Sequence, residues 1–217
     1  PLHGHPVLAQ SRHSAYQRLH QAWINKLGEV LASGSGTVLL YDIGGGRMGL
    51  ESLHVLLPRI VSAAGVDARR VYAHVSTPAA ASGDLGRSTS VRPALDKLNP
   101  VPANGPRNIT EGYVNFCEHR LGDCTCSAGF GTIMPISVHS LYYIQEWEWV
   151  AFAERVGGSV EVACAIHRPS ESGLIPADSP EFIWLSAKEA PQFYGWHDRL
   201  LSSVRGLLIN DPVVTMA

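Results

Sequence analysis

The sequence has little charge, few cysteines and no long hydrophobic run. Charged residues make up 17% of the 217 residues, and the formal net charge is −2. A protein that mainly grips a nucleic-acid backbone carries a clear excess of basic residues, so this balance argues against that class. No segment approaches the roughly 18–20 consecutive apolar residues of a membrane-spanning helix. Hydrophobic residues reach 45%, which is typical of a globular chain with one well-filled core.

The start of the chain lacks the marks of a secretion signal. Residues 1–5 have neither a basic start nor the apolar run that a signal peptide needs, and we expect a segment cut from a longer protein. The sequence has only four cysteines, and Cys117, Cys124 and Cys126 fall within ten residues of one another. Without a secretion signal, such clustering indicates metal ligation more readily than disulfides.

Hydrophobic periodicity predicts alternating helices and strands in the first third of the chain. Apolar residues recur at helical spacing over residues 11–31 and again over 50–64. Short β-prone apolar runs cover residues 37–41 and 71–75. The order strand, glycine-rich turn, helix, strand is that of one βαβ unit.

The rest of the chain continues this alternation after a long irregular stretch. Residues 76–112 are rich in Pro, Gly, Ser and Asn, and only 92–98 are compatible with a short helix. Further on, the patterns predict strands at 132–138, 159–166 and 181–185, and helices at 141–156 and 192–208. Together these elements predict an α/β fold with a mostly parallel central sheet.

A glycine-rich turn follows the first predicted strand, with the sequence Asp42-Ile-Gly44-Gly45-Gly46. Glycines at this position let a ligand approach the backbone and leave helix N–H groups free to bind it. The turn lacks the G-x-G-x-x-G spacing of dinucleotide enzymes. Short acidic-Gly-Gly turns are typical of S-adenosylmethionine-dependent methyltransferases. A tight strand-to-helix turn without a ligand explains the same residues equally well.

The cysteine cluster is compatible with a zinc site. Cys117 and Cys124 are seven residues apart, and Cys126 follows two residues later. Three thiolates and one imidazole make a tetrahedral zinc site. His74, at the end of a predicted strand, and His119, closer in sequence, are both candidates for the fourth ligand. The alternative interpretation is three buried free cysteines without a metal.

Two further groups of polar residues have a functional and a simpler interpretation. His5 and His13 precede or begin the first predicted helix, and a neutral imidazole is a competent nucleophile toward phosphorus. The simpler interpretation is a frayed end with solvated histidines. Asp84 and Arg87 offer a carboxylate for ribose hydroxyls and a guanidinium for phosphate, although a surface ion pair explains them too.

The joint order of these residues resembles the RNA-capping methyltransferase/guanylyltransferase domain of alphavirus-like positive-strand RNA viruses. That family includes alphaviruses, hepatitis E virus, tobamoviruses and bromoviruses. Its pattern combines two histidines eight residues apart, an Asp-Ile-Gly turn, a strand-end histidine with an Asp ten and an Arg thirteen residues later, and two cysteines seven apart. The matching residues are His5, His13, Asp42, Ile43, Gly44, His74, Asp84, Arg87, Cys117 and Cys124, followed by His139-Ser140-Leu141-Tyr142 and Tyr194 with His197.

The resemblance implies a Rossmann-like methyltransferase with helices on both faces of the sheet and a zinc-stabilised loop region. It implies a single capping-enzyme domain over residues 1–217, cut from a larger replicase polyprotein. The implied reaction is S-adenosylmethionine-dependent N7 methylation of GTP, formation of a covalent m7GMP–histidine, and transfer to 5′-diphosphate RNA. Two alternatives stay open: a methyltransferase without guanylyl transfer, and a non-enzymatic zinc-stabilised module that binds RNA or protein.

The resemblance also assigns a role to each candidate residue. His5 would carry the covalent nucleotide, Arg47 would contact the triphosphate, and Tyr194 would stack on guanine. The methyl-donor site would be lined by Asp42, Gly44 and Gly46, and the donor's ribose and neighbouring groups would be held by Asp84 and Arg87. Zinc would be bound by His74, Cys117, Cys124 and Cys126. It further implies other replicase domains as partners, peripheral membrane association, homo-oligomers, and a place in the host cytoplasm at membrane-associated replication complexes.

The chain departs from the family pattern in three places, one of which is Tyr142-Tyr143, where plant-virus members usually have Tyr-Asp. The family often has a cysteine one to three residues after the strand-end histidine, where this chain has Val75, Ser76 and Thr77. Cys126 would supply the missing thiolate. The carboxylate that alphavirus members use near the guanine corresponds to Met134 or a neighbour, so the residue that recognises guanine is not identified.

Overall fold

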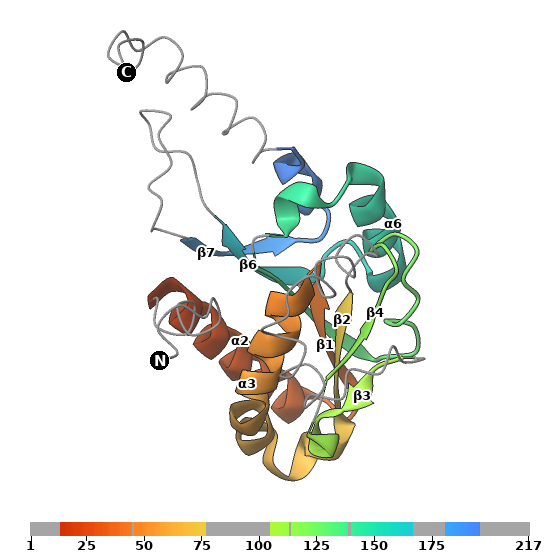
Figure 1. The fold of residues 1–217 in the computed structure, drawn as a ribbon. Helices are drawn as coiled ribbons and strands as arrows, with labels where there is room; N and C mark the ends of the chain where they lie inside the picture. Colours follow the sequence, from red (N-terminus) through yellow and green to blue (C-terminus); the bar gives the residue numbers. More distant parts are fainter. Residues whose placement is uncertain are drawn as a thin grey trace, which may run out of the picture.

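A seven-stranded sheet forms the centre of the protein in this computed structural model, which describes residues 14–44, 46–76, 105–112, 114–138, 140–166 and 181–195. The strand order is β3-β2-β1-β5-β6-β7, and β4 also pairs with β2 (Figure 1). The bounds are β1 Val38–Ile43, β2 Val71–Ser76, β3 Arg107–Asn108, β4 Asn115–Cys117, β5 Thr132–Val138, β6 Glu161–Ile166 and β7 Glu181–Ser186.

The sheet is mostly parallel, which confirms the predicted fold class. β1 pairs in parallel with β2 and β5, β2 with β4, and β5 with β6, whereas β3 and β7 are antiparallel. After β1 the chain extends the sheet first on the β2 side and later on the β5 side. Strand order therefore reverses between β1 and β5, and ligands of such sheets bind at the carboxyl ends of the strands at this point.

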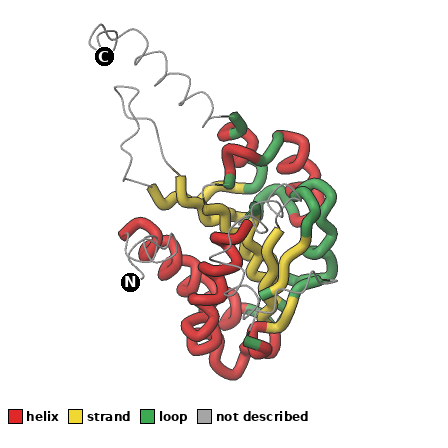
Figure 2. The backbone as a smooth tube through the Cα atoms, in the orientation of Figure 1, coloured by secondary structure: helices red, strands yellow, loops and turns green. Residues whose placement is uncertain are grey.

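Helices cover both faces of the sheet, as expected (Figures 1 and 2). α2 (Ser14–Ser33) and α3 (Gly46–Ala64) pack on one face, where Val38 and Leu40 of β1 join the core. α6 (Glu146–Val156) packs on the other, against Leu39 and Tyr41. β1 can therefore be apolar at nearly every position, because both its faces are buried. No helix in the described ranges is long and apolar enough to cross a membrane.

Short 3-10 turns complete the fold and correct two predictions. They are η1 (Gly65–Arg70), η2 (Ile109–Glu111), η3 (Leu141–Tyr143) and η4 (Ala190–Phe193). The single helix predicted at 141–156 is instead η3 followed by α6, because Ile144 is extended and Gln145 caps α6 in a capping box with Glu148. The helix predicted to start at 192 is wrong there, since η4 ends before the non-helical Tyr194. Residues 92–98 and 196–208 lie outside the described residues.

Element bounds also differ in informative ways. α3 begins at Gly46, four residues before the predicted start, so the helix grows directly out of the glycine-rich turn. The strand predicted at 159–166 begins at Glu161. β3 and β4 were not predicted, because strands of two and three residues carry no period that a sequence pattern can reveal.

Candidate metal centre and ligand pocket

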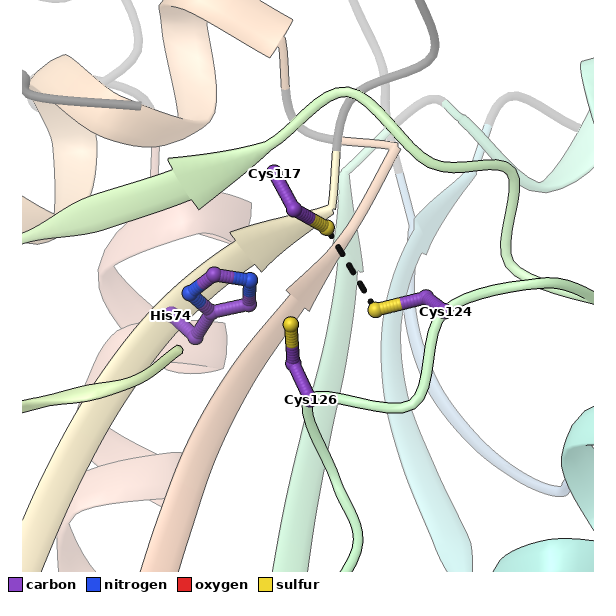
Figure 3. A group of neighbouring side chains, drawn as sticks. All are labelled: His74, Cys117, Cys124 and Cys126. Atoms are coloured by element: carbon purple, nitrogen blue, oxygen red, sulfur yellow. Dashed lines mark hydrogen bonds between the residues drawn. The ribbon is translucent and has the colours of Figure 1, made fainter. Parts of the chain in front are cut away.

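Four side chains converge beside the carboxyl end of β2: His74, Cys117, Cys124 and Cys126 (Figure 3). Their ligand atoms all lie within 4.8 Å of one another, and the Cys117 and Cys124 sulfurs are 3.4 Å apart. Two ligands come from the neighbouring strands β2 and β4, and two from the loop that follows β4. The structure thus brings together the four residues that the sequence proposed as zinc ligands.

The donor set and its surroundings fit zinc. Both ring nitrogens of His74 are buried, and neither has a hydrogen-bond partner within the described part of the chain. A buried imidazole rarely stays unsatisfied in this way, so a ligand for one of its nitrogens is expected. Two sulfurs bound to one tetrahedral zinc, each at about 2.3 Å, lie roughly 3.8 Å apart, close to the observed sulfur separation. Four protein ligands would leave no open position, which is the mark of a structural site.

The thiols of Cys117 and Cys124 share a hydrogen bond of 3.4 Å in which either sulfur can be the donor. Metals bind the thiolate and not the thiol, so zinc would replace this bond by releasing the thiol protons.

His119, the alternative fourth ligand, is not part of the group. Its side chain is exposed, and its backbone carbonyl accepts a hydrogen bond of 3.3 Å from the Ser76 hydroxyl. This bond ties the loop that follows β4 and carries Cys124 and Cys126, the candidate metal-binding loop, to the last residue of β2. Of the two histidines that the sequence left open, only His74 lies among the cysteines.

The glycine turn after β1 is shaped by a close contact with Ser140. Gly44 has a φ of 64°, and an added Cβ would lie 2.8 Å from the Ser140 Cβ. The Ser140 hydroxyl donates to the carbonyl of Ile43 and also bonds the Ser137 hydroxyl at 2.7 Å. Glycine is therefore required at position 44 both for its backbone conformation and for the space it leaves. This contact fastens the ends of β1 and β5 together at the point where strand order reverses.

Asp42, one residue before the end of β1, is buried without compensation. Its side chain is 2% exposed, and Oδ1 has no hydrogen-bond partner among the residues described. Burial raises the pKa of this carboxyl to about 7. Strand alternation places Asp42 on the same face as Leu40, which α2 and α3 cover. A buried acid of this kind, next to a glycine turn at the carboxyl end of a parallel strand, is a candidate functional group.

A cavity of about 100 Å³ opens at the carboxyl ends of β1, β2 and β5. Drug-sized ligands occupy about 300–1,000 Å³, so this cavity holds only part of such a ligand. One wall is Leu121 of the metal-binding loop, which makes the metal centre and the cavity neighbours. The cavity is lined by Gly44, Ser76, Leu121, Ser140, Tyr143, Ile144 and Glu148.

Several predicted site residues fall elsewhere. His5, Asp84 and Arg87 lie outside the described residues. Gly46 and Arg47 form the first turn of α3, but the side chain of Arg47 is not described. Tyr194 follows η4 and is 44% exposed.

The sequence did not single out two residues of the cavity, Ser76 and Glu148. Glu148 accepts a hydrogen bond of 2.9 Å from the Gln145 backbone N–H. Its spacing three residues after Gln145 is the signal of a capping box and not of a binding site. Only the sheet register brings Ser76 to this cavity, because it ends β2 beside Ile43 of β1.

No protein-family model and no curated protein sequence matches the chain. The comparison with solved structures found distant similarities, including the following three. The first is the glycopeptide N-methyltransferase MtfA complexed with S-adenosylhomocysteine, with 13% identity over 74% of this chain and 58% of that chain and a TM-score of 0.35. The second is an O-methyltransferase family protein from Burkholderia thailandensis, with 16% identity over 76% of this chain and 46% of that chain and a TM-score of 0.37. The third is the plantazolicin methyltransferase BpumL in complex with S-adenosylhomocysteine, with 14% identity over 93% of this chain and 71% of that chain and a TM-score of 0.37. The chain spans 58% and 46% of the length of the first two.

Proposed function

We propose that the chain is an S-adenosylmethionine-dependent methyltransferase whose donor binds at the carboxyl end of β1. The observation that carries the proposal is the turn at Gly44. It lies where strand order reverses, with the buried carboxyl of Asp42 before it, the N-terminus of α3 after it and a cavity beside it. Free N–H groups at that helix end, together with a carboxyl group, suit a ligand with both hydroxyl or ammonium donors and acceptor atoms.

Asp42 gives the donor site its chemical preference. Asp42 is 2% exposed and is not among the residues that line the cavity, but its Oδ1 has no hydrogen-bond partner from the described residues. A ligand O–H or N–H that reached this oxygen would gain a charge-assisted bond. A cationic group nearby would also favour the ionised carboxylate. Methyl transfer itself needs little acid–base help, because alignment of the methyl group with its acceptor supplies most of the rate.

The sequence resemblance extends the proposal to cap synthesis. The methyl group passes from the donor sulfonium to N7 of GTP, and S-adenosylhomocysteine leaves. An imidazole nitrogen of His5 attacks the α-phosphorus of m7GTP, forms a P–N bond and displaces pyrophosphate. The terminal phosphate oxygen of a 5′-diphosphate RNA then attacks the same phosphorus, and the imidazole leaves with the electrons of the P–N bond.

The remaining roles follow the same resemblance. Asp84 and Arg87 hold the donor's ribose and adjoining groups, and Arg47 contacts the triphosphate. Tyr194 stacks on the guanine, which becomes cationic on methylation and so gains a stronger attraction to an aromatic face. Its 44% exposure leaves part of the ring accessible to a ligand. A zinc ion fixes the loop beside the cavity and is held by His74, Cys117, Cys124 and Cys126.

The biological setting is proposed on the same ground. The domain acts within a larger replicase, in the host cytoplasm, at membrane-associated replication complexes. It associates with the membrane peripherally and forms homo-oligomers. A net charge of −2 fits an enzyme that holds RNA briefly, near its 5′ end.

The test uses the zinc-loaded chain with GTP and S-adenosylmethionine, labelled in parallel on the GTP α-phosphate or on the methyl group. We expect m7GTP and a donor-dependent covalent label that is absent from His5→Ala; His13→Ala serves as the matched control and keeps the label. Methylated GTP without any covalent label would instead support the methyltransferase without guanylyl transfer. Neither product, with no donor binding, would leave the zinc-stabilised binding module.

A further inference from the structure

Unsatisfied buried polar atoms gather at one place in this protein. Seven buried side-chain N or O atoms in the described ranges have no hydrogen-bond partner. Four of the seven belong to three neighbouring residues at the metal centre: the Tyr41 hydroxyl, both ring nitrogens of His74 and Asn115 Oδ1. Such atoms are rare in folded proteins, so their concentration calls for one physical cause.

Asn115 is the cross-strand neighbour of His74. β2 and β4 run parallel with these two residues in register, so both side chains stand on the same face of the sheet. Asn115 is fully buried, and its amide NH₂ donates to the Gly105 carbonyl at 3.3 Å. That bond orients the amide and leaves Oδ1 as an acceptor without a partner among the described residues, on the sheet face that carries His74.

Tyr41 is the neighbour of His74 on the other side. β1 and β2 pair these residues in register, and their rings are stacked with centroids 6.0 Å apart and an interplanar angle of 5°. The Tyr41 hydroxyl lies near the Cys124 thiol and the Ser76 hydroxyl but has no hydrogen bond of good geometry within the described structure. It is a buried donor beside one of the three candidate sulfur ligands.

We propose that Tyr41 and Asn115 are the outer shell of the metal centre. His74 binds the metal through the ring nitrogen that faces the three sulfurs (Figure 3). Its other N–H donates to Oδ1 of Asn115, the register partner of His74 on β4. Tyr41 donates its O–H to the Cys124 thiolate. The two bonds and the metal together satisfy all four orphaned atoms. The inference rests on the zinc centre and is independent of whether the domain transfers methyl groups.

These positioning residues have a clear physical role. A partner on the second imidazole nitrogen fixes the tautomer and raises the ligand basicity, and an O–H donor spreads the charge of a thiolate. Loss of such a partner typically costs about 10–100-fold in metal affinity. Asn115 and Tyr41 therefore belong to the metal site although neither touches the ion.

The test is a set of variants assayed for zinc affinity by competition with a chromophoric chelator, and for the visible spectrum of the Co²⁺ form. Asn115→Leu and Tyr41→Phe remove one outer bond each. Asn115→Asp keeps an acceptor, and Tyr72→Phe, on the same sheet face but outside the ligand group, is the control.

We expect Asn115→Leu and Tyr41→Phe each to weaken zinc binding tenfold or more and to shift the Co²⁺ d–d bands while one metal per chain is kept. Asn115→Asp should bind at least as tightly as wild type, which a residue needed only for packing would not predict, and Tyr72→Phe should match wild type. Affinities within twofold of wild type for both Asn115→Leu and Tyr41→Phe would overturn the proposal. So would Asn115→Asp losing as much affinity as Asn115→Leu. A wild-type chain that binds no zinc would overturn the metal centre itself, whatever its affinity for S-adenosylmethionine.

Discussion

Tyr41 and His74 are register partners on adjacent parallel strands, and their rings stack with an interplanar angle of 5°. Tyr41 immediately precedes Asp42, so the strand that leads into the glycine turn packs directly on a candidate metal ligand, His74. The metal-binding loop also reaches the cavity through Leu121. The candidate metal centre and the proposed donor site are thus connected by direct packing, through Tyr41 and through Leu121.

Metal removal should therefore destabilise the protein and weaken donor binding together. We expect one zinc per chain in wild type and none in Cys124→Ser, by elemental analysis. Loss of the metal should cost about 3 kcal/mol, which lowers Tm by roughly 6–12 °C in a domain of this size. Cys164→Ala is the control, because Cys164 is a buried cysteine outside the ligand group and its loss should leave the zinc content unchanged. Full zinc content in Cys124→Ser would contradict the assignment.

Gly44→Ala should disturb the turn after β1 more than an ordinary glycine substitution does. The new Cβ would meet the Ser140 Cβ at 2.8 Å, in addition to the strain of a positive φ. Gly65→Ala is matched in φ, at 54°, but has open space around the added Cβ. We expect Gly44→Ala to cost about 1–3 kcal/mol more in free energy of unfolding, measured by urea denaturation.

A double-mutant cycle isolates that contact. In a Ser140→Gly background the Cβ that Gly44→Ala would strike is gone, so the additional cost should shrink markedly. An equal cost in both backgrounds would mean that Ser140 does not constrain the turn.

Asp42→Asn should change how stability depends on pH. Burial raises the pKa of Asp42 from 3.8 to about 7, so between these values the folded protein holds a proton that the unfolded chain has released. Asp42 therefore lowers stability progressively as pH rises from about 4 to about 7. The stability of Asp42→Asn minus that of wild type should therefore increase between pH 4 and pH 8, by at most about 4 kcal/mol. The same stability difference at both pH values would show that the folded protein does not hold the Asp42 carboxyl in its protonated form.

His20 should act with the opposite sign. Burial, and then the charge of Arg59, lowers the pKa of His20 from 6.5 to about 4. The unfolded chain binds a proton in this window that the folded protein excludes, so stability is lost as pH falls from 6.5 towards 4. The stability of His20→Gln minus that of wild type should therefore increase as pH falls from 7.5 to 4, by at most about 3 kcal/mol.

The two groups together explain why single variants are needed. Over nearly the same pH window Asp42 and His20 contribute slopes of opposite sign, which largely cancel in wild type. Thermal melts of Asp42→Asn should therefore reveal the His20 slope, and melts of His20→Gln the Asp42 slope. Flat profiles in both variants would contradict the burial of both groups.

The sequence predicted the parts of the fold that repeat a pattern over several residues. β1 and β5 were recognisable as apolar runs, and α2 as a stripe at helical spacing, because burial selects residues along the whole element. The break at Ile144 was not recognisable. It depends on the capping box between Gln145 and Glu148, and the apolar pattern runs through it without interruption.

The convergence of the cysteines was predictable for a different reason. Thiols that cluster in sequence have few roles, so Cys117, Cys124 and Cys126 indicated a possible metal site without any knowledge of the fold. Tyr41 and Asn115 carry no such signal. Their importance comes from the register of β1, β2 and β4, which places one on each side of His74, and register is a property of the assembled sheet.

The proposed function depends on binding of the methyl donor at the turn of Gly44. Isothermal titration calorimetry of the zinc-loaded protein with S-adenosylmethionine measures that binding. We predict one site per chain in wild type and in Gly65→Ala, and at least a tenfold weaker affinity in Gly44→Ala. Absence of binding in wild type, or the same affinity in Gly44→Ala as in wild type, would contradict it.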